Sequence, residues 1–243
     1  MKYSSKRSDF LRFYDYLCHV IDVWHSRQTL WTAAPGYRLR NVTLPERLTN
    51  ISSYAFFNCN AFTSIIIPAS VTNIGNSAFA ACSNVTSIIV AEGNTIYDTR
   101  NNCNAIIETA TNKLISGCRN TVIPEGVTVI GEHAFYYCTK LATITIPEQV
   151  TTIEASAFRS CTALTAINIP AGVTSIGAYA FEECTSLTSV TVNAETPITI
   201  TSDVFSNRAN ATLYVPYGTK SQYRTTADWS SFSNMWKCPI RTM

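Results

Sequence analysis

The sequence has few charged residues and no long apolar run. Charged residues make up 14% of the 243 residues, and the formal net charge is only +2. A balance so close to neutral does not supply the basic surface with which proteins bind nucleic acids, so no nucleic acid partner is predicted. No run of 18 apolar residues occurs, which excludes a membrane-spanning helix on sequence grounds.

The residues as given also contain no export signal. The chain begins with basic side chains, but Asp15, His19 and Asp22 interrupt the apolar stretch that a signal peptide requires. The alternative that the chain comes from a secreted parent, whose leader precedes Met1, stays open. Eight of the eighteen Lys and Arg residues precede residue 48, beside four acids, so this end carries about +4. A solvated face is the simplest interpretation of these charges, and contact with a partner is the alternative.

Motifs of catalysis, cofactor binding and metal binding are missing as well. The sequence contains no C-x-x-C, H-E-x-x-H, G-x-S-x-G, G-x-G-x-x-G or G-x-x-x-x-G-K-[ST] pattern. Five of the nine cysteines recur at one position of a repeat, which is typical of buried structural residues rather than nucleophiles. His133 is interpreted as a surface histidine and not as a base for Cys138. We therefore predict no enzyme activity, no cofactor and no metal site.

What the sequence does contain is a repeat of 23 residues, marked by Pro45, Pro68, Pro124, Pro147 and Pro170. After the proline the typical unit continues with V-T-x-I, then Ala-Phe-x-x-Cys, then L-x-x-I-x-I-P. The I-x-I alternation indicates a strand, and the Ala-Phe segment suits a helical or 3-10 turn. The predicted fold is therefore a repeat solenoid, mainly β with short helical or 3-10 turns.

The recurring apolar positions define the core of each coil. In the unit that begins at Pro147, the expected inward residues are Val150, Ile153, Ala157, Phe158, Cys161, Leu164, Ile167 and Ile169. Burying them contributes on the order of 10–25 kcal/mol, whereas ordering the backbone costs about 1–2 kcal/mol per residue. One unit cannot fold alone, so stacking must supply the difference. The two residues between Phe and Cys are expected to face solvent.

One unit and both ends depart from the repeat. In residues 91–124 the runs "AIIE" and "KLIS" flank "TATN", which predicts an embedded β-hairpin with its turn at residues 109–112. Residues 1–38 are expected to form an N-terminal cap, with an amphipathic helix whose apolar face contains Phe10, Phe13, Leu17, Val20 and Trp24. Residues 39–216 are assigned to the solenoid. Residues 217–243 are assigned to a C-terminal cap that contains Tyr223, Trp229, Phe232 and Trp236.

Two expectations concern the cysteines. The repeated residues Cys59, Cys82, Cys138, Cys161 and Cys184 should be free thiols, because parallel stacking points their Cβ atoms the same way. Cys103 and Cys118 differ, since their numbers add to 221, as do those of residues 109 and 112 across the proposed turn. The hairpin would then place them opposite each other. A disulfide is one possibility, and burial of Cys118 at the first core position of its strand is the other.

Two surfaces are candidates for binding. The strand face offers uncharged side chains, and the candidate contacts are Thr143, Thr145, Thr165, Asn168, Thr188 and Thr191. Threonine also suits strands for its own sake, so a purely structural role is the alternative. In the turns, Phe57, Tyr136 and Tyr137 are expected to be exposed and to serve as aromatic anchors.

The units "IPASVTNIGNSAFAACSNVTSIIV" and "IPAGVTSIGAYAFEECTSLTSVTV" resemble the BspA-like class of leucine-rich repeats. The likeness covers roughly residues 39–216, and the long unit "NTIYDTRNNCNAIIETATNKLISGCRNTVIP" resembles that class as well. The resemblance implies a right-handed solenoid and a family found largely on bacterial and protist surfaces, where it binds host or matrix proteins and other cells. It implies no catalytic residues.

Two functions follow from these observations. The first is a non-catalytic, monomeric module for protein binding or adhesion, at the cell surface or secreted, with a host or matrix protein or a glycan as its partner. The alternative is a passive structural spacer or an intracellular interaction scaffold.

Overall fold

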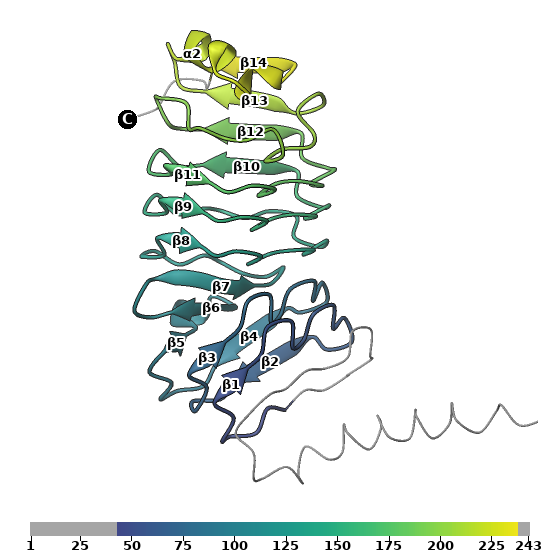
Figure 1. Cartoon of the computed structure of the whole chain (residues 1–243), viewed down its shortest axis with the longest axis vertical. Coiled ribbons are helices and arrows are strands. Elements are labelled where there is room, and N and C mark those ends of the chain that lie inside the picture. The colour runs from purple at the N-terminus through teal and green to yellow at the C-terminus, as the bar shows by residue number, and fades with distance from the viewer. Residues whose placement is uncertain (1–42, 238–243) are drawn as a thin grey trace, which may run out of the picture.

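The computed structural model describes residues 43–237, which form a solenoid of stacked coils (Figure 1). The V-T-x-I segments form one row of strands, β1 (Asn50–Ile51), β3 (Asn73–Ile74), β8 (Val129–Ile130), β9 (Thr152–Ile153) and β11 (Ser175–Ile176). The I-x-I segments form a second row, β2 (Ser64–Ile67), β4 (Ser87–Val90), β10 (Ala166–Ile169), β12 (Ser189–Val192) and β13 (Thr212–Val215). The predicted fold class, a mainly β repeat solenoid, is confirmed.

Neighbouring strands pair in parallel at a constant offset. Asn50 of β1 pairs with Asn73 of β3, and Ser64 of β2 pairs with Ser87 of β4, so both offsets equal 23 residues. The same offset joins β10 to β12 and β12 to β13. The repeat length of the sequence is therefore the register of the sheets.

The Ala-Phe-x-x-Cys segments stack into a row of turns. The Phe158 N–H donates to the carbonyl oxygen of Ala180 in the next coil, at 2.9 Å. The phenyl rings stack almost in parallel, with centroids 4.9 Å apart for Phe135 and Phe158 and 5.3 Å apart for Phe158 and Phe181. All eight core residues predicted for the Pro147 unit are buried, which confirms that set.

The recurring cysteine has a hydrogen-bonding role in this stack. The Cys161 Sγ lies 3.2 Å from the carbonyl oxygen of Phe135 in the preceding coil, and the Cys184 Sγ lies 3.1 Å from that of Phe158. Each thiol thus donates to a carbonyl inside the core, where polar groups need a partner. A small side chain with a donor fits this position better than alanine would.

The prediction that both residues between Phe and Cys face solvent is wrong in two coils. Ala80 and Ala81 are buried, because a later turn packs on them and the Ala81 N–H donates to the carbonyl oxygen of Tyr136 at 2.9 Å. Ser160 is also buried, because its hydroxyl donates to the carboxylate of Glu183 in the next coil.

The expected β-hairpin is confirmed in the long unit. Strands β6 (Ala105–Glu108) and β7 (Lys113–Gly117) pair antiparallel on either side of residues 109–112. Strand β5 (Tyr97–Asp98) adds to β6, and the 3-10 helix η2 (Arg100–Asn102) joins the two. Because β7 pairs in parallel with β8, the hairpin belongs to the first strand row.

This hairpin separates two hydrophobic cores. Ala105, Ile107 and Leu114 pack with the coils that follow it, whereas Ile106 and Cys118 pack with the coils that precede it. All five residues are almost completely buried. Burial on both faces is the usual reason for an uninterrupted apolar run in a strand. The hairpin is therefore a packed wall between the two parts of the solenoid.

Cys103 and Cys118 are free thiols, so the possible disulfide is wrong. A β-bulge at Ile115 of β7 shifts the register by one residue, and Ala105 pairs with Gly117, a pair whose numbers add to 222 rather than 221. Cys103 packs in the core of the coils that follow the hairpin, and Cys118 packs in the core of the coils that precede it. The alternative, in which Cys118 fills a core position, is confirmed.

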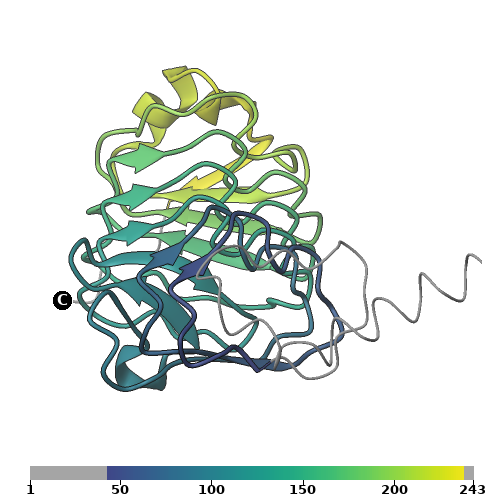
Figure 2. The same ribbon diagram turned by 60° about the horizontal axis from the view of Figure 1, so that its bottom comes forward.

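The long unit also bends the solenoid. On the strand side, β5, β6 and β7 are inserted before β8, and the Tyr97 hydroxyl accepts the Ile74 N–H of β3 at 3.0 Å. On the turn side the long unit has no Ala-Phe segment, so the turns of residues 77–82 and 133–138 are in direct contact. Extra strands on one side and a missing turn on the other tilt the first two coils (Figures 1 and 2). The turns therefore lie on the inner side of the bend.

The described chain ends in α2 (Lys220–Thr225), η3 (Trp229–Ser231) and β14 (Asn234–Lys237), and β14 pairs in parallel with β13. Tyr223 and Trp229 are fully buried, but Trp236 is 62% exposed. None of the helices in residues 43–237 is long and apolar enough to cross a membrane. The helix expected within residues 1–38 lies outside the described residues, and the domain boundaries stay a prediction.

Candidate binding surfaces

Of the strand-face candidates, Asn168 lies in β10 and Thr191 in β12, while Thr165 and Thr188 directly precede these strands. Thr143 and Thr145 lie in residues 141–147, where the expected strand does not form. Thr143, Thr145, Thr165, Asn168 and Thr188 are exposed, and Thr191 is half-buried. The Thr188 hydroxyl donates to the carbonyl oxygen of Thr165 at 3.3 Å, and the same bond joins Thr86 to Thr63 at 3.1 Å. Part of the threonine content therefore supports the stacking of coils, which agrees with the alternative of a structural role for these residues.

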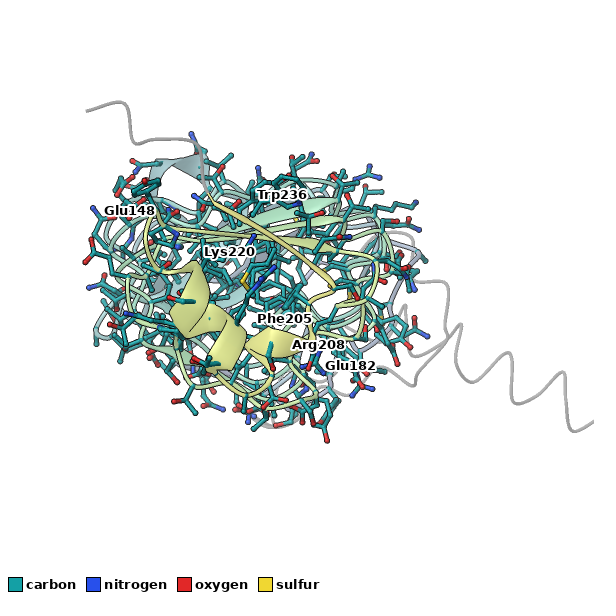
Figure 3. All side chains as sticks on the ribbon, turned by 90° about the horizontal axis from the view of Figure 1, so that it is seen from above. Glu148, Glu182, Phe205, Arg208, Lys220 and Trp236 are labelled. Carbon is teal, nitrogen blue, oxygen red and sulfur yellow. The ribbon has the colours of Figure 1, made fainter. Side chains whose placement is uncertain are left out.

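One repeat position runs straight along this face. Asn168, Thr191, Tyr214 and Trp236 are Cα partners in the consecutive strands β10, β12, β13 and β14, and we call them the C-terminal row. Residues in register point to the same side of a sheet. The Lys220 ammonium lies 5.9 Å from the ring centre of Trp236, and both are labelled in Figure 3. Sequence reasoning placed Trp236 in the cap and did not connect it with Asn168 and Thr191.

The turn face carries a cluster of rings that we call the bend cluster, formed by Tyr54, Phe57, His133, Tyr136 and Tyr137. The ring centroids are 5.7 Å apart for Tyr54 and Phe57, and 6.2 Å apart for Phe57 and Tyr136. Tyr136 also lies 5.1 Å from His133 and 4.9 Å from Tyr137. Residues from the first coil and from the coil after the hairpin thus form one surface.

Small residues in the intervening turn make this cluster possible. Ala80 and Ala81 carry no bulky side chain, so the rings of Phe57 and Tyr136 approach each other across them. Two serines beside Ala80 and Ala81 contact the turn of residues 133–138. The Ser83 hydroxyl donates to the Tyr137 carbonyl at 2.7 Å, and the Ser77 hydroxyl lies 2.9 Å from His133 Nδ1.

The backbone of the bend cluster is fixed in a conformation that side chains other than glycine adopt only with support. Tyr54, His133 and Tyr137 have φ angles of 59°, 57° and 54°, in the left-handed region. Their N–H groups donate to carbonyl oxygens of the adjacent coil, at 3.1, 3.2 and 2.8 Å. Because these bonds over-determine the backbone, the rings are held in place before any partner binds.

The sequence predicted part of the bend cluster. Tyr137 is 41% exposed as expected, whereas Phe57 and Tyr136 are half-buried among the other rings. Tyr54, which is 55% exposed, was missed, and His133 is half-buried rather than a plain surface residue. The available signal was the lack of an Ala-Phe segment in the long unit, which makes distant turns neighbours.

Charged side chains border the cluster in the next coils. The Arg159 Nε lies 2.8 Å from the Glu182 carboxylate, and the guanidinium packs 5.3 Å from the ring centre of Tyr179. The pKa of the Glu183 carboxyl is lowered, first by the hydrogen bond from Ser160 and then by Arg159. Glu183 therefore stays ionised at neutral pH, and Arg159 is partly neutralised by two carboxylates.

The repeated thiols offer no reactive nucleophile. Burial raises the pKa of Cys59 to about 11 and those of Cys82, Cys138 and Cys184 to about 12. A thiol with such a pKa has almost no thiolate at neutral pH, and the thiolate is the nucleophile. Within residues 43–237, no group of His, Cys, Asp and Glu side chains is arranged to hold a metal ion.

We expect the seven described cysteines to resist alkylation by iodoacetamide in the native protein at pH 8, because all are buried and free. They should react completely once the protein is unfolded in guanidinium chloride. Peptide mass spectrometry of non-reduced samples measures both states and also tests whether Cys103 and Cys118 are unbridged. Fast labelling of Cys138 without unfolding would contradict the burial of this row.

The sequence matches one family description, the BspA type leucine rich repeat region, in six copies over residues 36–114 and 106–225. No protein with a curated description matches the chain. The matched residues include both strand rows and the long unit.

Three solved structures resemble the fold. A leucine-rich repeat protein from Eubacterium ventriosum gives a TM-score of 0.59 at 24% identity, over 84% of this chain and 62% of that one. A leucine rich cell surface protein from Faecalibacterium prausnitzii gives 0.54 at 25% identity, over 88% and 59%. The pneumococcal vaccine antigen PcpA gives 0.53 at 18% identity, over 80% and 60%. This chain thus spans about three-fifths of the length of each.

Proposed function

This chain belongs to the BspA-type leucine-rich repeat family, and we propose that it is a non-catalytic binding module that holds a protein partner against the bend cluster. The observation that carries the proposal is the gathering of five rings, from coils on both sides of the hairpin, on the inner side of the bend. A solenoid provides an extended rigid surface of this kind, and a bend makes it concave.

The composition of the turn face supports a protein ligand. Tyrosine dominates the bend cluster, and two serine hydroxyls contact it, that of Ser77 at His133 and that of Ser83 at Tyr137. Asn58 and Asn60 follow Phe57 in the sequence. This mixture is typical of surfaces that bind proteins, because tyrosine supplies a large contact area at low entropic cost and the small polar residues adapt their hydrogen bonds. Burial raises the pKa of Tyr136, so its hydroxyl remains a donor at neutral pH.

Preorganisation supports the same conclusion. The left-handed residues of the cluster are fixed by bonds between coils, so little backbone freedom is lost when a partner binds. The net charge of +2 provides little long-range attraction, and binding should depend only weakly on salt.

We further propose that the module acts at a cell surface or after secretion, with a host or matrix protein as its partner. The support is the family membership and the likeness to the leucine rich cell surface protein from Faecalibacterium prausnitzii. A passive spacer or an intracellular scaffold is the competing function, and it differs because no residue on either face would be needed for specific binding.

Replacing Tyr54 and Tyr136 together by alanine should weaken binding about a thousandfold, because central aromatic anchors contribute about 2 kcal/mol or more each. A panel of immobilised fibronectin, laminin, collagen and fibrinogen, measured by surface plasmon resonance, is the assay. The matched control is Tyr217→Ala, a tyrosine that is 76% exposed and lies at the other end of the solenoid.

A second variant separates the two faces. Changing Thr143, Thr145 and Thr165 to lysine alters the strand face and leaves the bend cluster intact, so protein binding should persist. If the lysine variant loses binding and the tyrosine variant keeps it, the strand face is the docking surface instead. If no protein of the panel binds at low micromolar concentration, the spacer function is favoured.

A further inference from the structure

The C-terminal row has chemistry that differs from the bend cluster. It presents an amide, a hydroxyl, a phenol and an indole in four consecutive strands, and its fully outward member Trp236 is 62% exposed. The alternate residues Ile167, Val190, Leu213 and Met235 are buried on the other side of the same strands. The row is therefore a line of outward side chains across the sheet, in which Asn168 and Trp236 are exposed and Thr191 and Tyr214 are half-buried.

A second line beside it is flat and uncharged. Ala166, Ser189, Thr212 and Asn234 are Cα partners in the same four strands. Their short side chains leave a ledge beside the rings of Tyr214 and Trp236. None of these eight residues carries a charge, and the Lys220 ammonium lies 5.9 Å from the ring centre of Trp236.

Sugars match this surface. One face of a pyranose ring presents mainly C–H groups, which pack on an aromatic ring, while the ring hydroxyls at its edge bond to amides and hydroxyls. The row places such groups at a repeat of about 4.8 Å, the spacing of neighbouring strands, so successive sugar units can meet successive side chains.

We propose that the C-terminal row is a binding site for a neutral polysaccharide that lies across β10, β12, β13 and β14, with a pyranose ring stacked on Trp236. Tyr214 provides the next aromatic contact, and Thr191 and Asn168 hydrogen-bond the following units. Neither line of the ledge carries a charge, so along Asn168, Thr191 and Tyr214 the anions of sulfated and uronic-acid polysaccharides would lose water without gaining a cation. The Lys220 ammonium lies at the Trp236 end of the row.

Affinity electrophoresis of the full chain tests this site. Native gels that contain dextran, galactomannan, xyloglucan or hydroxyethyl cellulose serve as the neutral probes, and gels with hyaluronan or dextran sulfate serve as the anionic ones. Migration should be retarded by at least one neutral polysaccharide. Trp236→Ala and Tyr214→Ala should each weaken the retardation about tenfold, the size expected for loss of an aromatic contact. Trp236→Phe should retain most of it.

Tyr54→Ala is the matched control, since it removes an exposed tyrosine of the bend cluster and should leave the retardation unchanged. Retardation by none of the neutral probes, or by the anionic probes alone, would overturn the proposal. The proposal would also be overturned if the Trp236→Ala and Tyr214→Ala variants were both retarded as strongly as the unchanged protein. These outcomes are independent of the protein-binding test, because that test depends on the bend cluster and this one does not.

Discussion

Replacing Trp229 by alanine should lower the free energy of unfolding by about 3–5 kcal/mol. The indole is fully buried, contacts Phe205 and Tyr223 with ring centroids 5.8 and 5.5 Å away, and therefore closes the phenylalanine stack. Its Nε1 donates to the Ile198 carbonyl oxygen at 2.6 Å, so the change also leaves a buried acceptor without this partner. In a chain of this size the loss corresponds to a melting temperature lower by roughly 6–20 °C.

The chain offers its own control in a second tryptophan of the same cap. Trp236 is 62% exposed, and Trp236→Ala should change stability by no more than about 0.5 kcal/mol. Urea denaturation followed by circular dichroism compares the two variants. Equal midpoints for Trp229→Ala and Trp236→Ala would mean that the end of the solenoid does not depend on the stack.

The regular coils were predictable because core positions and register repeat together. The offset of 23 residues appears in the sequence as spaced prolines and in the structure as the pairing of Ser64 with Ser87. Each regular coil buries side chains at the same repeat positions, so the core residues of one coil predict those of the others. The buried set from Val150 to Ile169 follows directly.

The bend was not predicted, because it results from two features that are only visible together. The turn "TATN" predicts the hairpin, but the bulge in β7 and the burial of Ala105, Ile106 and Ile107 on both faces depend on what packs there. Three consecutive apolar residues were the available signal for a doubly covered strand. The missing Ala-Phe segment was the other signal, and it places Phe57 beside Tyr136.

The candidate sites also divide into residues at repeated positions, which were predictable, and residues brought together by contacts between coils, which were not. Residues at repeated positions, such as Asn168 and Thr191, were placed correctly on the outer strand face because alternation determines which side chain points outward. Tyr54 and His133 contact Phe57 and Tyr136 within their own turns. The contact between Phe57 and Tyr136 joins the two turns into one cluster, and the repeat does not encode it. Whether either surface binds a partner stays a prediction.

Raising the pH above about 9 should destabilise the protein steeply, because the repeated thiols keep their protons only in the fold. Burial raises the pKa of Cys82, Cys138 and Cys184 from 9.0 to about 12. Below pH 9 each thiol is protonated in both states, so its contribution to stability is complete. Between about pH 9 and 12 the unfolded chain releases the proton and the folded chain retains it, which costs about 1.4 kcal/mol per pH unit for each thiol.

Cys59, with a pKa of about 11, and Cys161, with a strongly raised pKa, add to the same loss. Together these thiols remove several kcal/mol per pH unit, which is large beside a total stability of roughly 5–15 kcal/mol. Urea midpoints at pH 8, 9, 10 and 10.5, under reducing conditions, measure the slope. Replacing Cys138 and Cys184 by alanine should lower stability at pH 8 but make the decline above pH 9 shallower, by about 2.7 kcal/mol per pH unit. An unchanged slope in that variant would show that other groups, such as the buried phenol of Tyr223, govern alkaline unfolding.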